Sequence, residues 1–570
     1  MTAEEIRARI IEVVTANGGH LASSLGAVEI AMALAEVFDP FRDRIVWDVG
    51  HQAYAWKILT GRDGEFGSLR RLGGVAPFPN PAESKADAAV AGHAGVSISV
   101  AAGLAAARDA RGSDEHVVAV VGDGAIANGT AFEAINNLSD ATRKLIVVLN
   151  DNEMSISHPV GSFARLFGRL ITNVRYNRVK SAAEAAGHRL KLTFLRGIYH
   201  KVESRIKGLF LASRFFEQFG LRYIGPVDGH DLATLKAAFS VAKDDKRSVI
   251  VHVVTKKGKG YPPAEREPTA YHGVSPASSK PGAGGGTDWS AAFGAALSSL
   301  AREDERVVAL TAGMKDGTGL ADFAGEFPGR FHDVGIAEGH MAAFAAGLAA
   351  GGMRPFVAVY STFLQRAVDQ VMHDVCIANL PVVFCVDRAG VVGADGVTHQ
   401  GLYDIAMLRC LPNLTICQPK DADDLAALMR EALNRNGPTV IRYPRGKVPQ
   451  PMQVPQVENP STCIWATGDW LGKAVSVAAQ VPGCQVVHAR YIKPFDAALL
   501  ARQRAAGAKI VSLENAACAG GLGEAIGADV RFGWPDEFIP HGSPAELERR
   551  CGLDVDSVVS RLSTHKTPTS

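Results

Sequence analysis

The sequence has almost no net charge, no long hydrophobic run and no closely paired cysteines, and each absence excludes a class of protein. Lysine and arginine together number 60 and aspartate and glutamate 59, which leaves a formal charge of +1. Such a balanced chain produces no strong electrostatic field, so binding to nucleic acid or to an anionic membrane surface is not expected. An anionic ligand must therefore be held by local side chains.

No apolar run approaches the ~18 residues that a membrane-spanning helix needs. The best stretch, Ala342 to Met353, is shorter and rich in glycine, and the N-terminal MTAEEIRARI lacks the layout of a signal peptide. None of the eight cysteines forms a C-x-x-C pair and several lie inside apolar runs, which argues for buried free thiols rather than a zinc site. We therefore expect a cytoplasmic protein without a membrane segment.

Two segments have the composition of exposed linkers. SPASSKPGAGGGTDW begins at Ser275, and the proline-rich GKVPQPMQVPQVENP begins at Gly446. A chain of 570 residues is long enough for three or four domains. We predict three domains separated by two linkers, with domains at residues 1–275, 288–446 and 461–570 and linkers at 276–287 and 447–460.

Short runs of valine, isoleucine and leucine alternate with helix-period segments throughout the chain. Examples are HVVAVV and KLIVVL in the first block, RVVALTAG, RPFVAVY, LPVVFCVD and LTICQP in the second, and CQVVHARYI and AKIVSLENA in the third. Continuous apolar strands that alternate with helices are typical of parallel sheets covered on both faces. The predicted fold class is α/β, with three domains that each contain a largely parallel sheet flanked by helices.

Two neighbouring strands in the first block each end in a polar cluster. Residues 117–121 are predicted as a buried strand that stops at Gly-Asp-Gly, and residues 145–149 as the next strand, which stops at Asn-Asp-Asn. Between them, Thr130 and Glu133 form the pattern of a helix capping box, and one helical face is predicted to contain Ala131, Phe132, Ile135 and Leu138.

Each polar cluster alone is best explained as a turn, because aspartate, asparagine and glycine are preferred there. Together they lie at the carboxyl edge of one sheet, where ligands of open α/β sheets bind. Asp123 and Asn152 can therefore converge, and their oxygens suit Mg²⁺ shared with phosphates. The pair is similar to the cofactor signature of thiamine-diphosphate enzymes.

Further segments narrow the resemblance, and they are GGHLASSLGAVE, WDVGHQAYAWKILTGR, FPNPAES, IGPVDGHD, TKKGKGY, DVGIAEGH, YSTFLQRAVDQ, DRAGVVGADGVTHQG, RYPRG and PDEFIPHG. By its resemblance in these segments, the chain is identified as a member of the 1-deoxy-D-xylulose 5-phosphate synthase family of the transketolase superfamily. The matches extend from about Arg7 to about Leu553. The resemblance implies a homodimer that uses thiamine diphosphate and Mg²⁺ to decarboxylate pyruvate and to add the two-carbon unit to glyceraldehyde 3-phosphate.

The resemblance also implies roles for individual residues. The metal ligands are Asp123, Asn152 and the carbonyl of Met154. Residues expected at the cofactor are His51, Gly92, His93, Ala94, Gly124, Ala125, Asn152, Tyr261, Glu338 and Phe363. Residues expected to bind substrate are Tyr360, Arg366, Arg388, His399 and Arg445, and those expected to take part in catalysis are Glu338, His20, His51, His399 and Asp395.

Simple physical arguments make these assignments reasonable, although each residue also has a plainer interpretation. Glu338 near a helix start could merely complement the helix dipole, but in an apolar site its raised pKa would keep a proton available for the cofactor ring. A single histidine is more often structural, whereas four histidines in matching segments favour proton exchange with substrate oxygens. Arginine binds phosphate with its planar fork, although a structural ion pair is the alternative.

The chain departs from the family pattern at two places near the cofactor. Where the family has G-H-S-S-T-S this chain has GHAGVS, so Ala94 and Gly95 replace two hydroxyl side chains and only backbone amides remain to meet a phosphate. Where the family has A-E-Q-H this chain has AEGH, with Gly339 beside Glu338. A transketolase-like enzyme with another donor or acceptor is therefore the alternative, and a non-catalytic relative is disfavoured because Asp123, Asn152 and Glu338 are all present.

Overall fold

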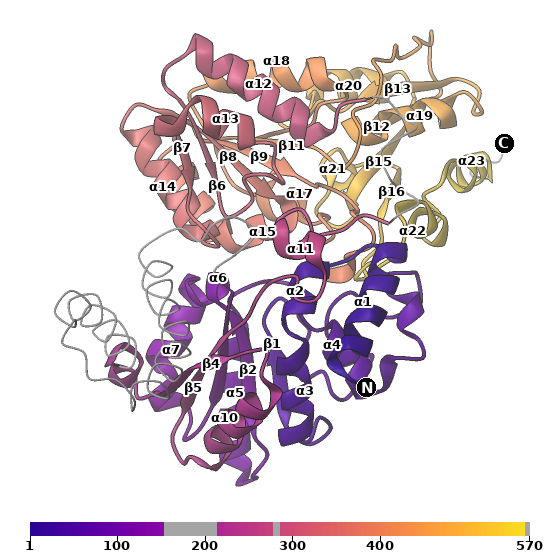
Figure 1. The fold of residues 1–570 in the computed structure, drawn as a ribbon. Coiled ribbons are helices and arrows are strands. Elements are labelled where there is room, and N and C mark those ends of the chain that lie inside the picture. The colour runs from indigo at the N-terminus through magenta and orange to yellow at the C-terminus, as the bar shows by residue number, and fades with distance from the viewer. Residues whose placement is uncertain (153–213, 277–285, 565–570) are drawn as a thin grey trace, which may run out of the picture. The chain divides into compact units, whose positions relative to one another are not determined.

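The computed structural model describes residues 1–152, 214–276 and 286–564. They form two compact units, Met1–Lys280 and Pro281–Ser570, which are considered separately (Figure 1). Met154 lies outside the described residues, as does the irregular segment 155–220 up to residue 213.

The first unit contains one five-stranded sheet in which every pairing is parallel, in the order β1-β2-β3-β5-β4. Its strands are β1 (Arg44–Trp47), β2 (Val117–Gly122), β3 (Ile146–Asp151), β4 (Arg222–Asp228) and β5 (Val249–Val254). Its helices are α1 (Ala3–Asn17), α2 (Leu21–Gly26), α3 (Val28–Val37), α4 (Tyr54–Lys57), α5 (Ser97–Arg111), α6 (Asp123–Ile126), α7 (Gly129–Ala141), α10 (Leu232–Asp244) and α11 (Pro262–Arg266).

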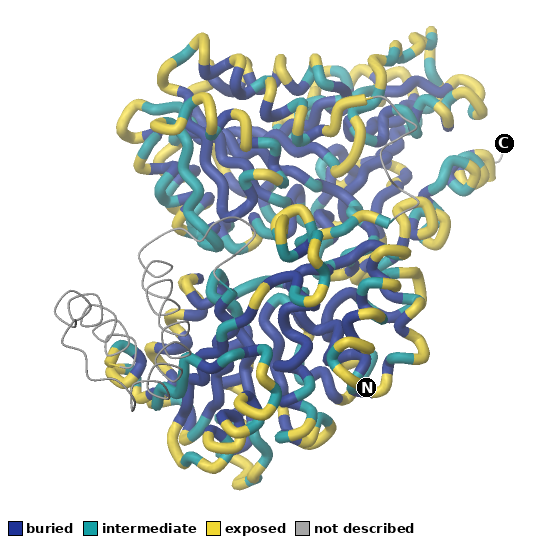
Figure 2. The backbone as a smooth tube through the Cα atoms, viewed as in Figure 1, coloured by how far each residue is buried: buried dark blue, intermediate teal, exposed yellow. Residues whose placement is uncertain are grey.

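Both faces of this sheet are buried, as the continuous apolar strands predict. Val118 and Val120 of β2 pack in one cluster with α1, α3 and α10, whereas Ala119 and Val121 pack in another with α5 and α7. Alternate residues of a strand point to opposite faces, so each face needs its own layer of helices. Figure 2 shows the strands as the buried interior of the unit.

The start of α7 differs from the prediction. The side chain of Asn128 caps the helix by accepting a hydrogen bond from the Thr130 backbone N–H at 3.0 Å, so the predicted capping box of Thr130 and Glu133 is wrong. Asparagine caps a helix as well as threonine does, and Asn128 is the first suitable residue along the chain. Phe132 is also misassigned, because it is 38% exposed while the other residues predicted on its face are buried.

The second unit contains two sheets. The larger has the order β14-β10-β11-β9-β8-β6-β7 and is parallel except for the antiparallel pair of β14 with β10; the smaller has the order β13-β12-β15-β16 and is wholly parallel. The strands are β6 (Val307–Thr311), β7 (Phe331–Asp333), β8 (Arg354–Tyr360), β9 (Val383–Asp387), β10 (Thr415–Cys417), β11 (Thr439–Arg442), β12 (Thr462–Ala466), β13 (Cys484–His488), β14 (Tyr491–Lys493), β15 (Lys509–Ala517) and β16 (Val530–Trp534).

Helices cover both sheets of this unit. They are α12 (Trp289–Glu303), α13 (Ala321–Glu326), α14 (Glu338–Ala350), α15 (Ser361–Leu364), α16 (Val368–Gln370), α17 (Asp404–Leu408), α18 (Ala422–Asn434), α19 (Leu471–Ala478), α20 (Ala497–Ala505), α21 (Leu522–Ala525), α22 (Pro544–Arg550) and α23 (Val555–Thr564). The predicted α/β class, with largely parallel sheets flanked by helices, is therefore confirmed. The predicted domain boundaries stay a prediction.

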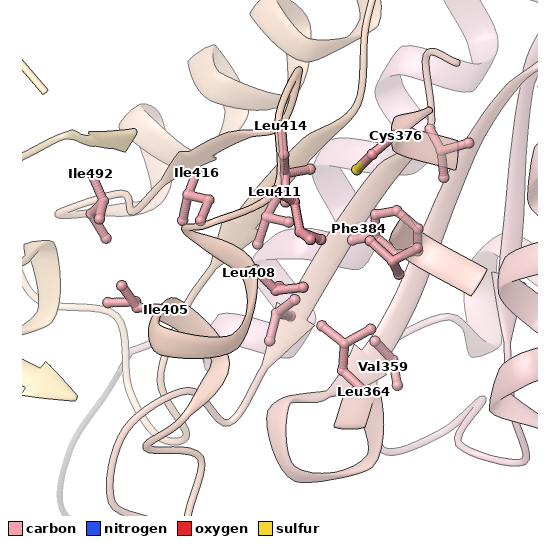
Figure 3. Packing of buried hydrophobic residues seen from close by; sticks show 14 of the residues in the cluster. Val359, Leu364, Cys376, Phe384, Ile405, Leu408, Leu411, Leu414, Ile416 and Ile492 are labelled. Carbon is pink, nitrogen blue, oxygen red and sulfur yellow. The ribbon is translucent and has the colours of Figure 1, made fainter. Parts of the chain in front are cut away.

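One hydrophobic cluster extends from the larger sheet into the smaller one. It contains Phe384 of β9 and Ile416 of β10 together with Trp465 of β12 and Ile510 of β15. Figure 3 shows Ile492 of β14 beside the residues of β10 and α17 in this cluster. The two sheets of the second unit therefore share part of their core.

The structure also bears on two expectations from the sequence, the lack of a membrane-spanning helix and the burial of free cysteines. In that part of the chain, no helix combines the length and apolarity needed to cross a bilayer. All eight cysteines are free thiols and five of them are buried, as their positions in apolar runs predict.

Candidate active site

The carboxyl ends of β2 and β3 lie side by side in the first unit. Gly122 of β2 pairs with Asn150 of β3, so Asp123 follows at the level of Asp151. Burial and then the negative charge of Asp151 raise the pKa of Asp123 to about 7, while the Gly124 N–H and Lys257 oppose the shift. A buried carboxylate of this kind is stabilised by a cation.

The Asn-Asp-Asn cluster divides into two structural residues and one candidate ligand. Asn150 donates to Gln52 Oε1 at 2.7 Å and accepts from Thr255 Oγ1 at 2.6 Å. Asp151 lies 3.0 Å from His252 Nε2. Both side chains are thus used within the fold, whereas Asn152 follows the end of β3 and stays the predicted ligand. In the described part of the chain, no group of three or more histidine, cysteine, aspartate or glutamate side chains could hold a metal.

The GHAGVS segment does not offer all of its amides to a phosphate. The Asp48 carboxylate accepts hydrogen bonds from the Gly95 N–H at 2.8 Å and from the Ser97 N–H at 3.0 Å, so the Gly95 amide is used within the fold, while the phosphate contact expected at Ala94 stays a prediction. Glycine is required at 95 because φ is +82° and an added Cβ would lie 2.6 Å from Asn128. Glycine at 95, where the family has serine, therefore allows this segment to pack closely on Asn128, the N-cap residue of α7.

Three histidines of the first unit form a cluster. The ring centroid of His272 lies 5.5 Å from that of His20 and 5.5 Å from that of His51, and His20 and His51 are 6.1 Å apart. Burial, followed by the repulsion of neighbouring cationic groups, holds the pKa of His51 and of His272 well below the usual range. Both imidazoles are therefore neutral at pH 7, when each can accept as well as donate a proton.

Sequence reasoning missed two members of this region, His272 and Lys257. His272 precedes Gly273, so the same signal that marked the other histidines, a neighbouring glycine in a motif segment, would have found it. Lys257 is one of three lysines in TKKGKGY, and only its burial singles it out. That burial lowers the pKa of Lys257 to about 8, against the opposing attraction of Asp123.

The neutral histidines give a testable pH dependence of stability. In the unfolded chain a histidine takes up a proton near pH 6.5, but His51 in the folded protein resists it, so stability is lost as the pH falls below about 6.5. We expect His51→Gln to flatten the fall in melting temperature between pH 7 and pH 5. The exposed His373, whose pKa is raised by its hydrogen bond to Asp374, provides the control His373→Gln. Parallel curves for wild type and His51→Gln would contradict the prediction.

The remaining cofactor candidates of the first unit lie in loops and at helix starts. Gly92, His93 and Ala94 precede α5, and Ala125 lies in the short helix α6. The Gly124 N–H donates to Asp123 Oδ1 at 3.0 Å. Tyr261 is the N-cap residue of α11, and its ring lies 5.7 Å from that of Tyr271.

Glu338 is the first residue of α14 in the second unit, and it is only 3% exposed. Burial raises the pKa of its carboxyl, although the charge of Arg366, 3.7 Å from Oε2, acts in the opposite direction. Glu338 Oε2 is buried and accepts no hydrogen bond from the described residues. Burial thus favours the neutral form of this carboxyl, and its Oε2 atom can still take a hydrogen-bond partner.

Four of the predicted side chains form a cluster in the second unit, next to the carboxyl ends of β8 and β9. The Phe363 ring lies 5.7 Å from that of Tyr360 and 5.6 Å from that of His399. The Arg388 guanidinium lies 3.8 Å from the centre of the Tyr360 ring and donates to the Gly317 carbonyl at 3.0 Å. Four of the predicted residues are thus brought together by the fold.

Two further predicted residues, Arg445 and Asp395, form an ion pair of 4.0 Å. Arg445 is about half exposed, so this pair contributes little to stability and leaves the guanidinium accessible. Tyr360 is the last residue of β8 and Arg388 directly follows β9, so both lie at the carboxyl edge of the larger sheet, where β8 and β9 are neighbours. Glu338 and Arg366 are linked to each other by their 3.7 Å contact.

Comparison with known proteins finds related family profiles along most of the chain. Profiles described as 1-deoxy-D-xylulose-5-phosphate synthase, transketolase pyrimidine-binding domain and transketolase C-terminal domain match residues 1–255, 286–451 and 453–558. Among curated proteins, 1-deoxy-D-xylulose-5-phosphate synthase 2 of Geobacter sulfurreducens is 45% identical over 99% of this chain and 95% of its own. The synthase of Clostridium perfringens strain SM101 is 44% identical over 99% and 96%. A solved transketolase from Leishmania mexicana is 19% identical, covers 100% of this chain and 98% of its own, and has a TM-score of 0.46.

Parallel α/β sheets with polar residues gathered at their carboxyl edges, together with these profiles, define a protein of the transketolase class, which depends on thiamine diphosphate. More closely, the full-length identity of 44–45% shows that the chain belongs to the 1-deoxy-D-xylulose-5-phosphate synthase family.

Proposed function

We propose that this protein decarboxylates pyruvate on thiamine diphosphate and condenses the two-carbon unit with glyceraldehyde 3-phosphate, which yields 1-deoxy-D-xylulose 5-phosphate and CO2. The structural observation that carries the proposal is Glu338, a buried carboxyl with a raised pKa and an oxygen that has no hydrogen-bond partner in the described residues. The product class follows from family membership.

The residues of the second unit fit the aminopyrimidine part of the cofactor. Glu338 can share its proton with a ring nitrogen through Oε2, and Phe363 provides an aromatic face for the ring. When bound, thiamine diphosphate supplies an electron sink for the carbon that loses CO2. Burial raises the pKa of Glu338, which favours the protonated carboxyl that this contact needs.

The residues of the first unit fit Mg²⁺ and the diphosphate. Asp123 offers a partly buried carboxylate and Asn152 an amide oxygen, and the proposed third ligand is the carbonyl of Met154. Hard oxygen donors of this kind would suit Mg²⁺, whose charge would help to hold a diphosphate. The proposed contacts to the cofactor in this unit are His51, Gly92, His93, Ala94, Gly124, Ala125 and Tyr261.

The substrates are assigned to the remaining groups. We assign the acceptor phosphate to Arg388 and Arg445, with Tyr360 as an added donor, because guanidinium groups bind phosphate with two parallel hydrogen bonds. Arg366 belongs to the same predicted set, and its contact with Glu338 gives it a second task, the orientation of that carboxyl. His20, His51, His399 and Asp395 are proposed to exchange protons with the substrate carbonyl and hydroxyl oxygens.

The assembly and location of the protein are further proposals. The family resemblance supports a homodimer, which size-exclusion chromatography with light scattering can test. The balanced charge and the free cysteines support a cytoplasmic protein that binds neither nucleic acid nor membrane.

The direct test is to incubate the pure protein with pyruvate, glyceraldehyde 3-phosphate, thiamine diphosphate and Mg²⁺. We expect release of CO2 and formation of the five-carbon product, each dependent on all four additions. The altered GHAGVS segment favours the alternative, a transketolase-like enzyme with another donor. Turnover of xylulose 5-phosphate without pyruvate would support this alternative and overturn the proposal.

A further inference from the structure

The loop of residues 388–401 carries three of the proposed substrate residues, Arg388, Asp395 and His399. It is closed by two backbone hydrogen bonds between Gly390 and Gly401, with N···O distances of 2.7 and 2.8 Å. Arg388 begins the loop with φ of +59°, a conformation that side chains other than glycine rarely adopt. Such a strained residue keeps its position only when its surroundings hold it there.

Asn515 of β15, in the smaller sheet, holds the first part of this loop. Its Oδ1 accepts hydrogen bonds from the Val391 N–H at 3.2 Å and from Trp534 Nε1 at 2.8 Å. The approach is close, because a Cβ added to Gly390 would lie 2.1 Å from Asn515 Nδ2. The pairing of β15 with β16 shifts register between Leu513 and Ala517, and irregularities of this kind re-aim side chains out of the sheet.

Gln400 links the second part of the loop to the segment between β16 and α22, which contains Pro540 and His541. Its Oε1 accepts from the Val392 N–H at 2.8 Å and from the Gly393 N–H at 3.2 Å, while its Nε2 donates to the Pro540 carbonyl at 3.1 Å. Gly396 also lies against this region, because an added Cβ there would lie 3.1 Å from the Cβ of His541. Asp395 and His399 flank these contacts in sequence.

A network of polar side chains holds Asn515 in a fixed position. Asp469 accepts from Asn515 Nδ2 and from Gln418 Nε2, both at 2.7 Å, and Gln418 accepts from Arg442 at 2.6 Å. Arg442, which is 0% exposed, also forms two hydrogen bonds to Asp404. Networks whose members are all paired in a low-dielectric interior hold one geometry firmly.

We propose that Asn515 and Gln400 are positioning residues through which the smaller sheet sets recognition of the acceptor phosphate, although residues 461–570 contain no predicted site residue. Asn515 acts through Val391 on Arg388, and Gln400 acts on the turn between Asp395 and His399. The inference rests on the proposed function, because Arg388 is assigned to the phosphate there. A displaced guanidinium loses its two-pronged hydrogen bonds to phosphate but leaves the carbonyl chemistry of the acceptor intact.

The test compares Asn515→Ala with the double variant D469N/N515D. The alanine removes the acceptor for the Val391 N–H. The double variant exchanges the amide and the carboxylate, so every hydrogen bond of the pair keeps a donor and an acceptor. We expect Asn515→Ala to raise KM for glyceraldehyde 3-phosphate by about tenfold or more, the loss of one hydrogen bond to a charged group, and to leave KM for unphosphorylated glyceraldehyde unchanged within about twofold. The double variant should resemble wild type with both acceptors.

Gln503→Ala is the matched control, because Gln503 is buried in the same unit and bonds Trp465 Nε1 at 2.8 Å without touching the loop. It should lower the melting temperature without changing the ratio of the two KM values. The proposal is overturned if Asn515→Ala affects both acceptors equally, or if Gln503→Ala changes the ratio as much. An inactive wild type would instead reject the proposed function.

Hydrogen exchange of the wild-type protein tests the same contact without activity, and also if Asn515→Ala does not fold. The Val391 amide should exchange much more slowly than exposed loop amides, because its hydrogen bond to the buried Asn515 must open first. Exchange of Val391 at the rate of exposed loop amides would overturn the proposal.

Discussion

Replacement of Glu338 by glutamine is expected to lower the rate of pyruvate decarboxylation by about a hundredfold to ten-thousandfold, the usual contribution of a positioned acid or base. Glutamine keeps the size of the side chain but cannot give and regain a proton. Thiamine diphosphate should still bind, because the diphosphate contacts lie on other residues. CO2 release and calorimetric titration of the cofactor measure the two effects separately. The exposed Glu303 at the end of α12 provides the control Glu303→Gln, which should have the rate of wild type.

The same variant is expected to gain stability. Burial raises the pKa of Glu338, so above the ordinary glutamate pKa the unfolded chain releases a proton that the folded protein retains. This difference favours the unfolded state as the pH rises past about 4.3 and is absent below it. Glu338→Gln should therefore melt higher than wild type at pH 7 and equally at pH 4. A lower melting temperature at pH 7 would mean that the ion pair with Arg366 outweighs the cost of burial.

Replacement of Asp123 by alanine is expected to weaken Mg²⁺-dependent binding of thiamine diphosphate by at least about a hundredfold, since even residues that only support metal ligands change affinity by ten- to a hundredfold. Asp123 is the carboxylate among the three proposed ligands, and its charge offsets that of the cation. Calorimetric titration of the cofactor at fixed Mg²⁺ measures the loss. The matched control is Asp140→Asn, on the exposed face of α7 in the same unit.

This loss should not reflect misfolding. Asp123 and Asp151 repel each other in the protein, so removal of one carboxylate relieves a cost rather than a stabilising contact. The melting temperature of Asp123→Ala without cofactor should therefore stay close to that of wild type. Cofactor affinity equal to that of wild type would exclude Asp123 as a ligand.

Apolar patterning predicted the central strands well because these strands are buried on both faces. Valine, alanine, phenylalanine and cysteine make up most of β2, β8 and β9, and a short continuous apolar run between turns is typical of such a strand. β7 is a short Phe-His-Asp strand at the edge of the larger sheet, and a pattern this short and polar carries no signal.

The segment CQVVHARYI shows where local patterning fails. In the sequence it is one apolar run, but in the structure it divides into β13 of the smaller sheet and β14 of the larger one. Both halves are β-forming, and the break at Ala489 and Arg490 arises because Arg490 bonds Asp424 and Glu431 of α18. Contacts with residues so distant in sequence are invisible to periodicity.

The sequence by itself determined the α/β class, the family and the residue types of the candidate site, because these depend on local apolar runs and on motifs that are continuous in the chain. Tertiary structure alone decided which polar groups near the site form hydrogen bonds that hold the fold instead of facing a ligand. Asp48 accepts hydrogen bonds from the Gly95 and Ser97 amides of GHAGVS, Asn150 is held by Gln52 and Thr255, and Asn515 supports a loop more than a hundred residues before it. Hydrogen bonds between distant segments, and the pKa shifts that burial imposes on Asp123 and Glu338, exist only once the sheets have packed.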